Sequence, residues 1–110
     1  MTKRINKHDT FFQWRKERRI APILLEVLDE VQTIDDYRKV YKVRWHVMGT
    51  DKVSPSVFPM MATDGCFYGF VPIPRDTYLR ATKILKETAS YPSARRRILT
   101  LMKKELVKKS

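Results

Sequence analysis

The stretch that decides the fold runs from Ile23 to Met48 and reads ILLEVLDEVQTIDDYRKVYKVRWHVM. Its first part carries apolar residues at the spacing of one helix face, and carboxylates take the opposite side. Pro22 precedes this part and suits the first turn of a helix. We therefore predict an amphipathic helix over residues 22–31, which is the most strongly patterned element of the chain.

The second part, residues 33–48, fits two periods. As a helix, it has a capping hydroxyl at Thr33, carboxylates in its first turn and a stop signal at Gly49. As a strand, aromatic and β-branched residues alternate with basic residues from Tyr41 to Val47. Because the caps match at both ends, we favour the helix and keep the strand as the alternative.

On the N-terminal side, Gln13 follows the hydroxyl of Thr10 at the spacing of a capping box, which predicts a short helix to about Ile20. On the C-terminal side, two short apolar runs flank the dipeptide Asp64-Gly65. Both turn residues tolerate positive φ angles, so this pattern predicts a β-hairpin over residues 57–62/66–71.

Two helices are predicted after the hairpin, over about residues 77–89 and from about residue 94 onward, and their short connection makes them antiparallel. The expected fold class is α+β and mainly helical, with about four to five helices and one short β-hairpin. A chain of 110 residues has room for one core. We assign residues 10–107 to a single globular domain, residues 1–9 to a basic N-terminal arm and residues 108–110 to a basic tail.

The charge balance of the chain is strongly basic. Twenty-three Lys and Arg residues oppose 12 Asp and Glu residues, which gives a net charge of +11. The bases gather in residues 1–20 and 91–110, with seven in each block, whereas residues 21–36 hold five acids and no base. Charge of this size acts on the choice of partner rather than on the fold. The expected partner is therefore a nucleic acid or an acidic protein surface.

Two clusters of cations form the candidate nucleic-acid interface. In the first, aromatic rings that can stack on bases stand beside cations that can neutralise phosphates, although a buried aromatic face with solvated cations also explains it. In the second, three consecutive arginines and two lysines lie on the last predicted helix, where a solvated surface is the alternative. With one arginine from residues 33–48, the candidate residues are Phe11, Trp14, Arg15, Lys16, Arg18, Arg19, Arg44, Arg95, Arg96, Arg97, Lys103 and Lys104.

These patterns predict a non-catalytic protein that binds the backbone of RNA or DNA as a component of a larger assembly, such as a ribosome or a viral particle. We expect no cofactor, because the two histidines lack metal-ligand spacing and the chain has no phosphate-binding glycine loop. The enzyme alternative is a nuclease that binds Mg²⁺ through Glu26 with Asp29 or Glu30, or through Asp35 with Asp36.

The apolar runs and the cysteine content bear on location. No apolar run approaches the roughly 18 residues that a membrane-spanning helix needs, so we expect no membrane span. The single cysteine, Cys66, fits a reducing intracellular compartment, either the cytoplasm or an organellar matrix. We expect its side chain to be buried, as is usual for an isolated cysteine.

The predicted helix pair resembles part of a known family. Residues 83–87 (KILKE) and residues 91–93 (YPS), followed by an arginine-rich helix, resemble the first two helices of the mitochondrial LYR-motif proteins. Aligned on the proline, Arg80, Ala81 and Thr82 stand where that family has its Leu-Tyr-Arg triplet. The resemblance implies an alternative function, that of an accessory or regulatory subunit whose basic helical face binds an acidic protein partner.

Overall fold

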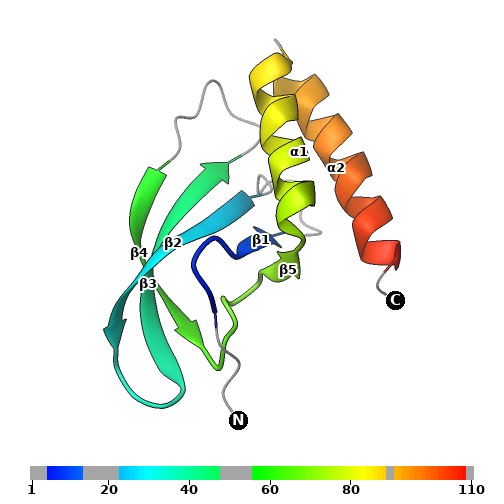
Figure 1. Ribbon diagram of the computed structural model, residues 1–110. Helices are drawn as coiled ribbons and strands as arrows, with labels where there is room; N and C mark the ends of the chain where they lie inside the picture. The colour runs from blue at the N-terminus through cyan, green and yellow to red at the C-terminus, as the bar shows by residue number, and fades with distance from the viewer. Residues whose placement is uncertain (1–4, 14–22, 48–55, 89–90, 109–110) are drawn as a thin grey trace.

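The computed structural model describes residues 5–13, 23–47, 56–88 and 91–108, in which five β-strands precede two α-helices (Figure 1). The elements are β1 (Thr10–Gln13), β2 (Ile23–Thr33), β3 (Arg38–Val47), β4 (Ser56–Thr63), β5 (Val71–Ile73), α1 (Arg75–Glu87) and α2 (Tyr91–Lys108). The prediction of a mainly helical protein with four to five helices and one hairpin is therefore wrong, because a five-stranded sheet makes up most of the fold.

The strands form one antiparallel sheet in the order β4-β3-β2-β1-β5. The strands β4 and β5 are consecutive in the sequence but occupy opposite edges of this sheet. The chain therefore crosses the sheet between them, over residues 64–70, which we call the crossover segment. The two helices run antiparallel to each other beside the sheet (Figure 1).

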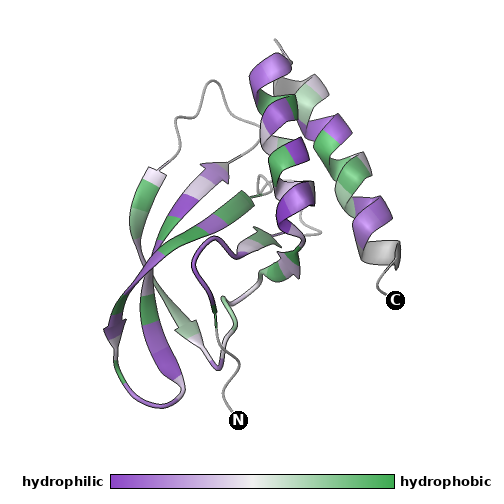
Figure 2. Ribbon diagram, viewed as in Figure 1, coloured by the Kyte–Doolittle hydropathy of each residue, from purple (hydrophilic) through white to green (hydrophobic). Residues whose placement is uncertain are grey.

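Two hydrophobic clusters lie on opposite faces of the sheet. Successive side chains of a strand point to opposite faces, and accordingly Phe11 and Leu25 belong to one cluster, whereas Phe12 and Leu24 belong to the other. The first cluster is Ile5, Phe11, Leu25, Val27, Tyr41, Val43, Ala62 and Phe67. The second is Phe12, Leu24, Ile73, Tyr78, Ala81, Ile98 and Met102. Thus the crossover segment covers one face and the helices cover the other, and hydrophobic residues recur along both helices (Figure 2).

The predicted helix over residues 22–31 is instead strand β2. The first half of this strand is buried on both faces, since Leu24 in the second cluster and Leu25 in the first are each 0% exposed. A strand that is buried on both faces carries a continuous apolar run, which periodicity alone does not separate from a helix. Register shifts after Val27 and after Glu30 further break the alternation of the strand.

The predicted helix over residues 33–48 is also wrong. The strand alternative, which rested on Tyr41 to Val47, is correct, and strand β3 begins three residues earlier, at Arg38. The alternation is visible in the structure, since Tyr41 is buried and Lys42 is exposed. The expected first turn of the helix forms the turn between β2 and β3, where the carboxylate of Asp35 accepts a hydrogen bond from the backbone N–H of Arg38 at 2.8 Å. Aspartate stabilises turns and helix starts by the same bond, so its presence did not decide between them.

The described part of the predicted helix over residues 10–20 is strand β1. Phe11 and Phe12 are both buried, one on each face of the sheet, as expected for a strand between two covered faces. The hydroxyl of Thr10, expected to cap a helix, donates instead to the carbonyl of Ile73 in β5 at 2.8 Å. The rest of this predicted helix lies outside the described residues.

The predicted turn at Asp64-Gly65 is confirmed, but the hairpin over residues 57–62/66–71 is not. Asp64 and Gly65 have φ angles of 51° and 73°, and the backbones of Thr63 and Cys66 exchange two hydrogen bonds across the turn, at 2.9 and 3.0 Å. After this point the chain leaves β4, and its next strand pairs with β1 at the far edge of the sheet. The buried ring of Phe67, which is 1% exposed, holds the crossover segment in the first cluster.

The two C-terminal helices are confirmed, and each begins two or three residues before the predicted position. Tyr78 and Ala81 of α1 are buried at a spacing of three residues, and Ile98 and Met102 of α2 are buried at a spacing of four. These spacings place one apolar stripe of each helix toward the sheet. The opposite sides carry mainly polar and charged residues, although Leu79 of α1 is also exposed.

Candidate functional site

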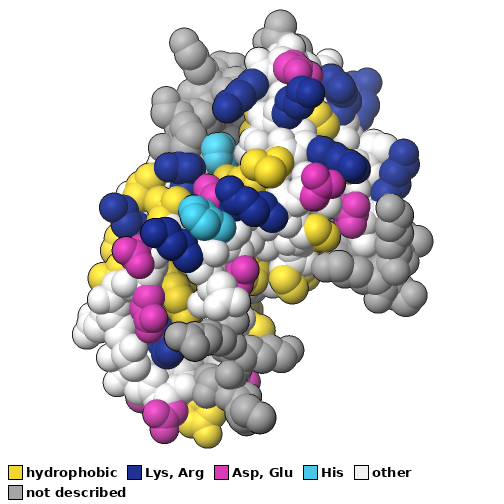
Figure 3. All heavy atoms as spheres, in the orientation of Figure 1, with side chains coloured by type: hydrophobic (Ala, Val, Ile, Leu, Met, Phe, Trp, Pro, Cys, Tyr) yellow, Lys and Arg dark blue, Asp and Glu magenta, His cyan; other side chains and the backbone are white. Residues whose placement is uncertain are grey.

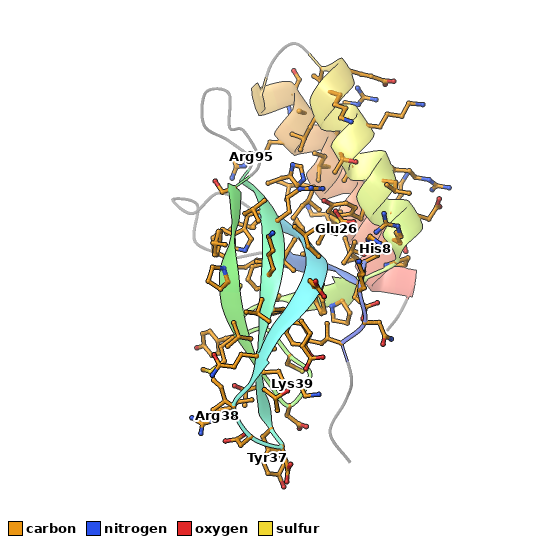
Figure 4. All side chains as sticks on the ribbon, turned by 60° about the vertical axis from the view of Figure 1, so that its left-hand side comes forward. His8, Glu26, Tyr37, Arg38, Lys39 and Arg95 are labelled. Carbon is orange, nitrogen blue, oxygen red and sulfur yellow. The ribbon has the colours of Figure 1, made fainter. Side chains whose placement is uncertain are left out.

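A buried carboxylate with three nitrogen partners lies between the sheet and the first turn of α1. Glu26 of β2 is 5% exposed. Its Oε2 accepts a hydrogen bond from Nη1 of Arg75 at 2.9 Å and lies 3.3 Å from Nδ1 of His8, and its Oε1 accepts from Nη1 of Arg44 at 3.2 Å. We call these four residues the Glu26 cluster. Figure 4 shows His8 and Glu26 next to each other beside α1.

Separate parts of the chain bring the members of the Glu26 cluster together. Glu26 and Arg44 are directly opposite each other in the register of β2 and β3, so they form an oppositely charged cross-strand pair. Arg75 is the first residue of α1, which follows β5 at the edge of the sheet beyond β1. His8 lies in the turn that leads into β1. The site therefore depends on the assembled sheet and does not exist in any single element.

The surroundings of Glu26 keep its side chain ionised. Burial by itself would raise the pKa of Glu26, but hydrogen bonds from Arg75 and His8 and the charges of Arg75 and Arg44 outweigh it, and the pKa is lowered. Arg44 and Arg75 are nearly half exposed, with side-chain exposures of 42% and 45%. The cluster is thus an ionised carboxylate with two guanidinium groups whose outer sides meet the solvent.

The turn that contains His8 is built around these contacts. His8 has a φ angle of 72°, in the left-handed region that residues other than glycine rarely adopt. Its N–H donates to the carbonyl of Val27 at 2.8 Å, and its carbonyl accepts from Nη1 of Arg75 at 3.0 Å. The left-handed backbone costs about 1–2 kcal/mol for such a residue. The described part of the predicted N-terminal arm, residues 5–9, is thus packed on the sheet, and Ile5 is buried.

His46 and Tyr78 lie beside the Glu26 cluster, with ring centroids 6.0 Å apart. Burial, and then the charges of Arg44 and Lys86, lower the pKa of His46 against the opposing charge of Glu26, so the imidazole is neutral at pH 7. Burial, and then Glu26, raise the pKa of Tyr78 to about 12, so its phenol keeps its proton. Both rings are therefore uncharged hydrogen-bonding groups at neutral pH.

Replacing Glu26 by glutamine is expected to reduce the free energy of unfolding by about 1–2 kcal/mol at pH 7, because the guanidinium groups lose a charged acceptor but still reach water. The difference in unfolding free energy between the wild type and E26Q should become smaller as the pH falls. In the wild type, the unfolded chain takes up a proton at Glu26 near its ordinary pKa of 4.5, whereas the folded chain does so only at lower pH. The wild type therefore loses the stabilisation from ionised Glu26 as the pH falls below about 4.5. The E26Q protein lacks this contribution at every pH.

Urea unfolding at a series of pH values measures this effect. Glu30→Gln is a matched control, because Glu30 lies on the same strand but is exposed, and its contacts with the Thr33 hydroxyl at 3.1 Å and with Lys39 at 3.5 Å are open to solvent. At pH 7, the E30Q protein should lose less than about 1 kcal/mol of unfolding free energy, the usual range for an exposed ion pair. Equal slopes for E26Q and the wild type between pH 5 and pH 3 would contradict the assignment of the low pKa to Glu26.

The structure separates the residues of the predicted interface. Phe11 is 5% exposed and packs edge-on against Phe67 at 5.1 Å, so its ring offers no surface for stacking. Arg44 belongs to the Glu26 cluster. The remaining residues of the first predicted cluster lie outside the described residues, and these are Trp14, Arg15, Lys16, Arg18 and Arg19.

The second predicted cluster lies on α2, and the structure divides its three arginines. Arg95 is partly buried, and its Nε is a buried atom without a hydrogen-bond partner within the described part of the chain. Arg96 and Arg97 are exposed, as are Lys103 and Lys104 one heptad later. Because seven residues are close to two helical turns, Arg96 lies in line with Lys103, and Arg97 lies in line with Lys104. We call these four residues the α2 cation rows.

Sequence reasoning missed the Glu26 cluster. It treated Glu26 as one of five surface acids, but the structure buries this side chain, whereas Asp29, Glu30 and Asp36 are exposed. The helix face on which the nuclease alternative placed these acids does not exist, because they lie on β2 and its turn. In the described ranges, no three His, Cys, Asp or Glu side chains are grouped so that they could hold a metal ion. Cys66 is exposed, contrary to expectation.

The fold and the site define an α+β protein in which an antiparallel five-stranded sheet and a helix pair enclose a buried, arginine-paired carboxylate. No protein-family model, curated protein or solved structure matches this chain significantly. Among the residues that the structure describes, no helix is both long enough and apolar enough to cross a membrane.

Proposed function

We propose that the protein binds RNA or DNA through the phosphate backbone, with the outer surface of the helix pair as its main contact. The observation that carries this proposal is the arrangement of the α2 cation rows, two parallel rows of exposed cations along one helix. Cations at fixed positions on a rigid helix neutralise phosphates without a need for base-specific contacts. On this view the protein is a non-catalytic component of a larger intracellular nucleoprotein assembly.

The distribution of charge supports this assignment. The two helices carry ten Lys and Arg residues against three Asp and Glu residues, which is an excess of seven out of the net +11 of the whole chain. On α1, two of the cations pair with carboxylates of the same helix, Arg80 with Asp76 at 3.1 Å and Lys83 with Glu87 at 3.8 Å. Side chains of Lys and Arg are spread over both helices on the viewed face in Figure 3. By sequence, α2 holds an excess of five positive charges and α1 an excess of two, so most of the surplus lies on α2.

Binding is expected to weaken steeply with salt. If about six phosphates are neutralised on duplex DNA, the logarithm of the association constant should fall against the logarithm of the salt concentration with a slope of about −5. Fluorescence anisotropy with a labelled duplex and a labelled single-stranded RNA, each at four salt concentrations, measures this slope. Affinity that does not change with salt would rule out the phosphate backbone as the main contact.

An acidic protein partner on the same helices is the second candidate function. Leu79 of α1 is 48% exposed between the cations of that helix, and an apolar side chain in a charged surface is typical of a protein contact. The two candidates differ in their response to mutation. Leu79→Ala should leave nucleic-acid affinity unchanged, whereas it should weaken the binding of a protein partner that contacts this apolar side chain.

A further inference from the structure

The contacts within the Glu26 cluster leave the outer parts of two arginines available to a ligand. Among the described residues, the hydrogen bonds of Arg44 and Arg75 run through Nη1, which in both cases is directed at Glu26. A guanidinium group has five N–H donors in a fixed fork. With each side chain more than 40% exposed, Nε and Nη2 can donate to an acceptor that comes from the solvent.

The charge around these donors favours an anion. Two guanidinium groups, those of Arg44 and Arg75, share the one carboxylate of Glu26, so the three groups together carry a net positive charge. Both histidines of the chain lie on the same face, where Lys and Arg side chains surround them and acidic side chains lie beside them (Figure 3). Because Glu26 is buried whereas the side chains of Arg44 and Arg75 are more than 40% exposed, an incoming anion meets the cations first.

We propose that Arg44 and Arg75 bind a phosphate monoester, and that Glu26 is a positioning residue that holds both guanidinium groups in place. A monoester carries nearly two negative charges at pH 7 and three acceptor oxygens, which match two forks of donors. The half-exposed ring of His8, 54% accessible at its side chain, lies within the same cluster and supplies an additional donor when it is protonated. The α2 cation rows take no part in this site, so the inference does not rest on the proposed function.

Prior ordering of the arginines explains why a buried glutamate would improve an anion site. A free arginine side chain loses rotamer freedom when it binds a ligand, and this loss weakens binding. Here the bonds to Glu26, and the bond from Arg75 to the carbonyl of His8, have already fixed the side chains. The left-handed backbone of His8 is what places that carbonyl within 3.0 Å of Arg75.

Titration with inorganic phosphate tests the site, monitored through the arginine Nε–H signals in ¹H–¹⁵N NMR spectra of the whole chain. We expect two arginine signals to shift together, and we expect Arg44→Gln and Arg75→Gln each to weaken phosphate binding at least tenfold. Arg80→Gln is the matched control, since it removes the same charge from an exposed ion pair of α1 and should change the affinity less than twofold. Equal losses in R75Q and R80Q, or no shift of any arginine signal, would overturn the proposal.

The role of Glu26 has its own readout. A purely electrostatic effect predicts that Glu26→Gln binds phosphate more tightly, because a negative charge is removed. A positioning role predicts weaker binding, by about fivefold or more, in a protein whose circular dichroism spectrum is that of the wild type. Tighter binding by E26Q would therefore refute the positioning role. Arg75→Lys, which keeps the charge but loses the fork of donors, should also bind more weakly and covers the case in which E26Q does not fold.

Two further ligands distinguish between a small phosphorylated molecule and the phosphorylated end of a nucleic-acid strand as the ligand of this site. Ribose 5-phosphate represents small phosphorylated molecules, and a 5′-phosphorylated oligonucleotide, compared with its 5′-hydroxyl form, represents strand ends. Binding of either one that is lost in R75Q supports the site. If the protein binds ribose 5-phosphate but shows no salt-dependent binding of nucleic acid, this inference stands and the proposed function fails. The two failures are therefore distinguishable.

Discussion

Replacing Phe67 by alanine is expected to lower the free energy of unfolding by about 3–5 kcal/mol, the range for deleting a buried phenylalanine. The ring is 1% exposed and meets three others edge-on, Phe11 at 5.1 Å, Tyr41 at 6.0 Å and Phe70 at 6.4 Å. Since domains of this size are stable by only about 5–15 kcal/mol, the variant should be close to unfolding at room temperature.

Thermal and urea unfolding of F67A measure this loss, and the neighbouring residue gives the control. Tyr68 lies next to Phe67 in the crossover segment but is 92% exposed. Tyr68→Ala should therefore change the free energy of unfolding by less than about 0.5 kcal/mol. Similar losses in the two variants would mean that the ring of Phe67 does not close the first hydrophobic cluster.

Neutralising the α2 cation rows is expected to reduce nucleic-acid affinity by about two to three orders of magnitude near 0.1 M salt. The variant replaces Arg96, Arg97, Lys103 and Lys104 by glutamine. If each cation contacts one phosphate of duplex DNA, the slope of log affinity against log salt should become less steep by about 3–4. Glutamine is a good helix former, so α2 should remain intact and the loss should come from the missing charges.

A second variant with the same change in net charge provides the control for these measurements. It replaces four cations away from α2 by glutamine, namely Lys7, Arg38, Lys39 and Lys42. Arg38 and Lys39 lie near the far end of the β2–β3 ribbon in Figure 4, away from the helices. Affinity should fall much less in this protein. A loss as large as that of the α2 variant would show that binding follows total charge and that the helix pair is not the interface.

The sequence predicted the C-terminal part of the fold well because its signals are local. Both helices bury residues at helical spacing, and the turn at Asp64-Gly65 needs only two residues with positive φ angles. The prediction failed for strands β1 to β3, because the burial that identifies them as strands depends on residues far away in the sequence. The burial of Leu24 and Leu25 on opposite faces depends on helices and a crossover segment that follow much later in the chain.

The candidate site was predicted only in part for the same reason. The cations on α2 are consecutive or nearly consecutive in the sequence, but the sequence did not show that Arg95 is partly buried whereas Arg96 and Arg97 are exposed. The Glu26 cluster joins residues that are 18 and 49 positions apart, and only the strand register brings them together. A glutamate flanked by apolar residues on both sides was the one local indication that this side chain is not a surface charge.

The place of β5 in the sheet has a consequence for how the protein is made. Its pairing with β1 joins residues 63 positions apart, Thr10 and Ile73, so most of the polypeptide has left the ribosome before the last strand can dock. Until then, β1 has an unpaired edge, and the apolar side chains of the sheet that face α1 and α2 remain uncovered. Nascent chains of this protein should therefore fold late and depend on protection from aggregation during translation.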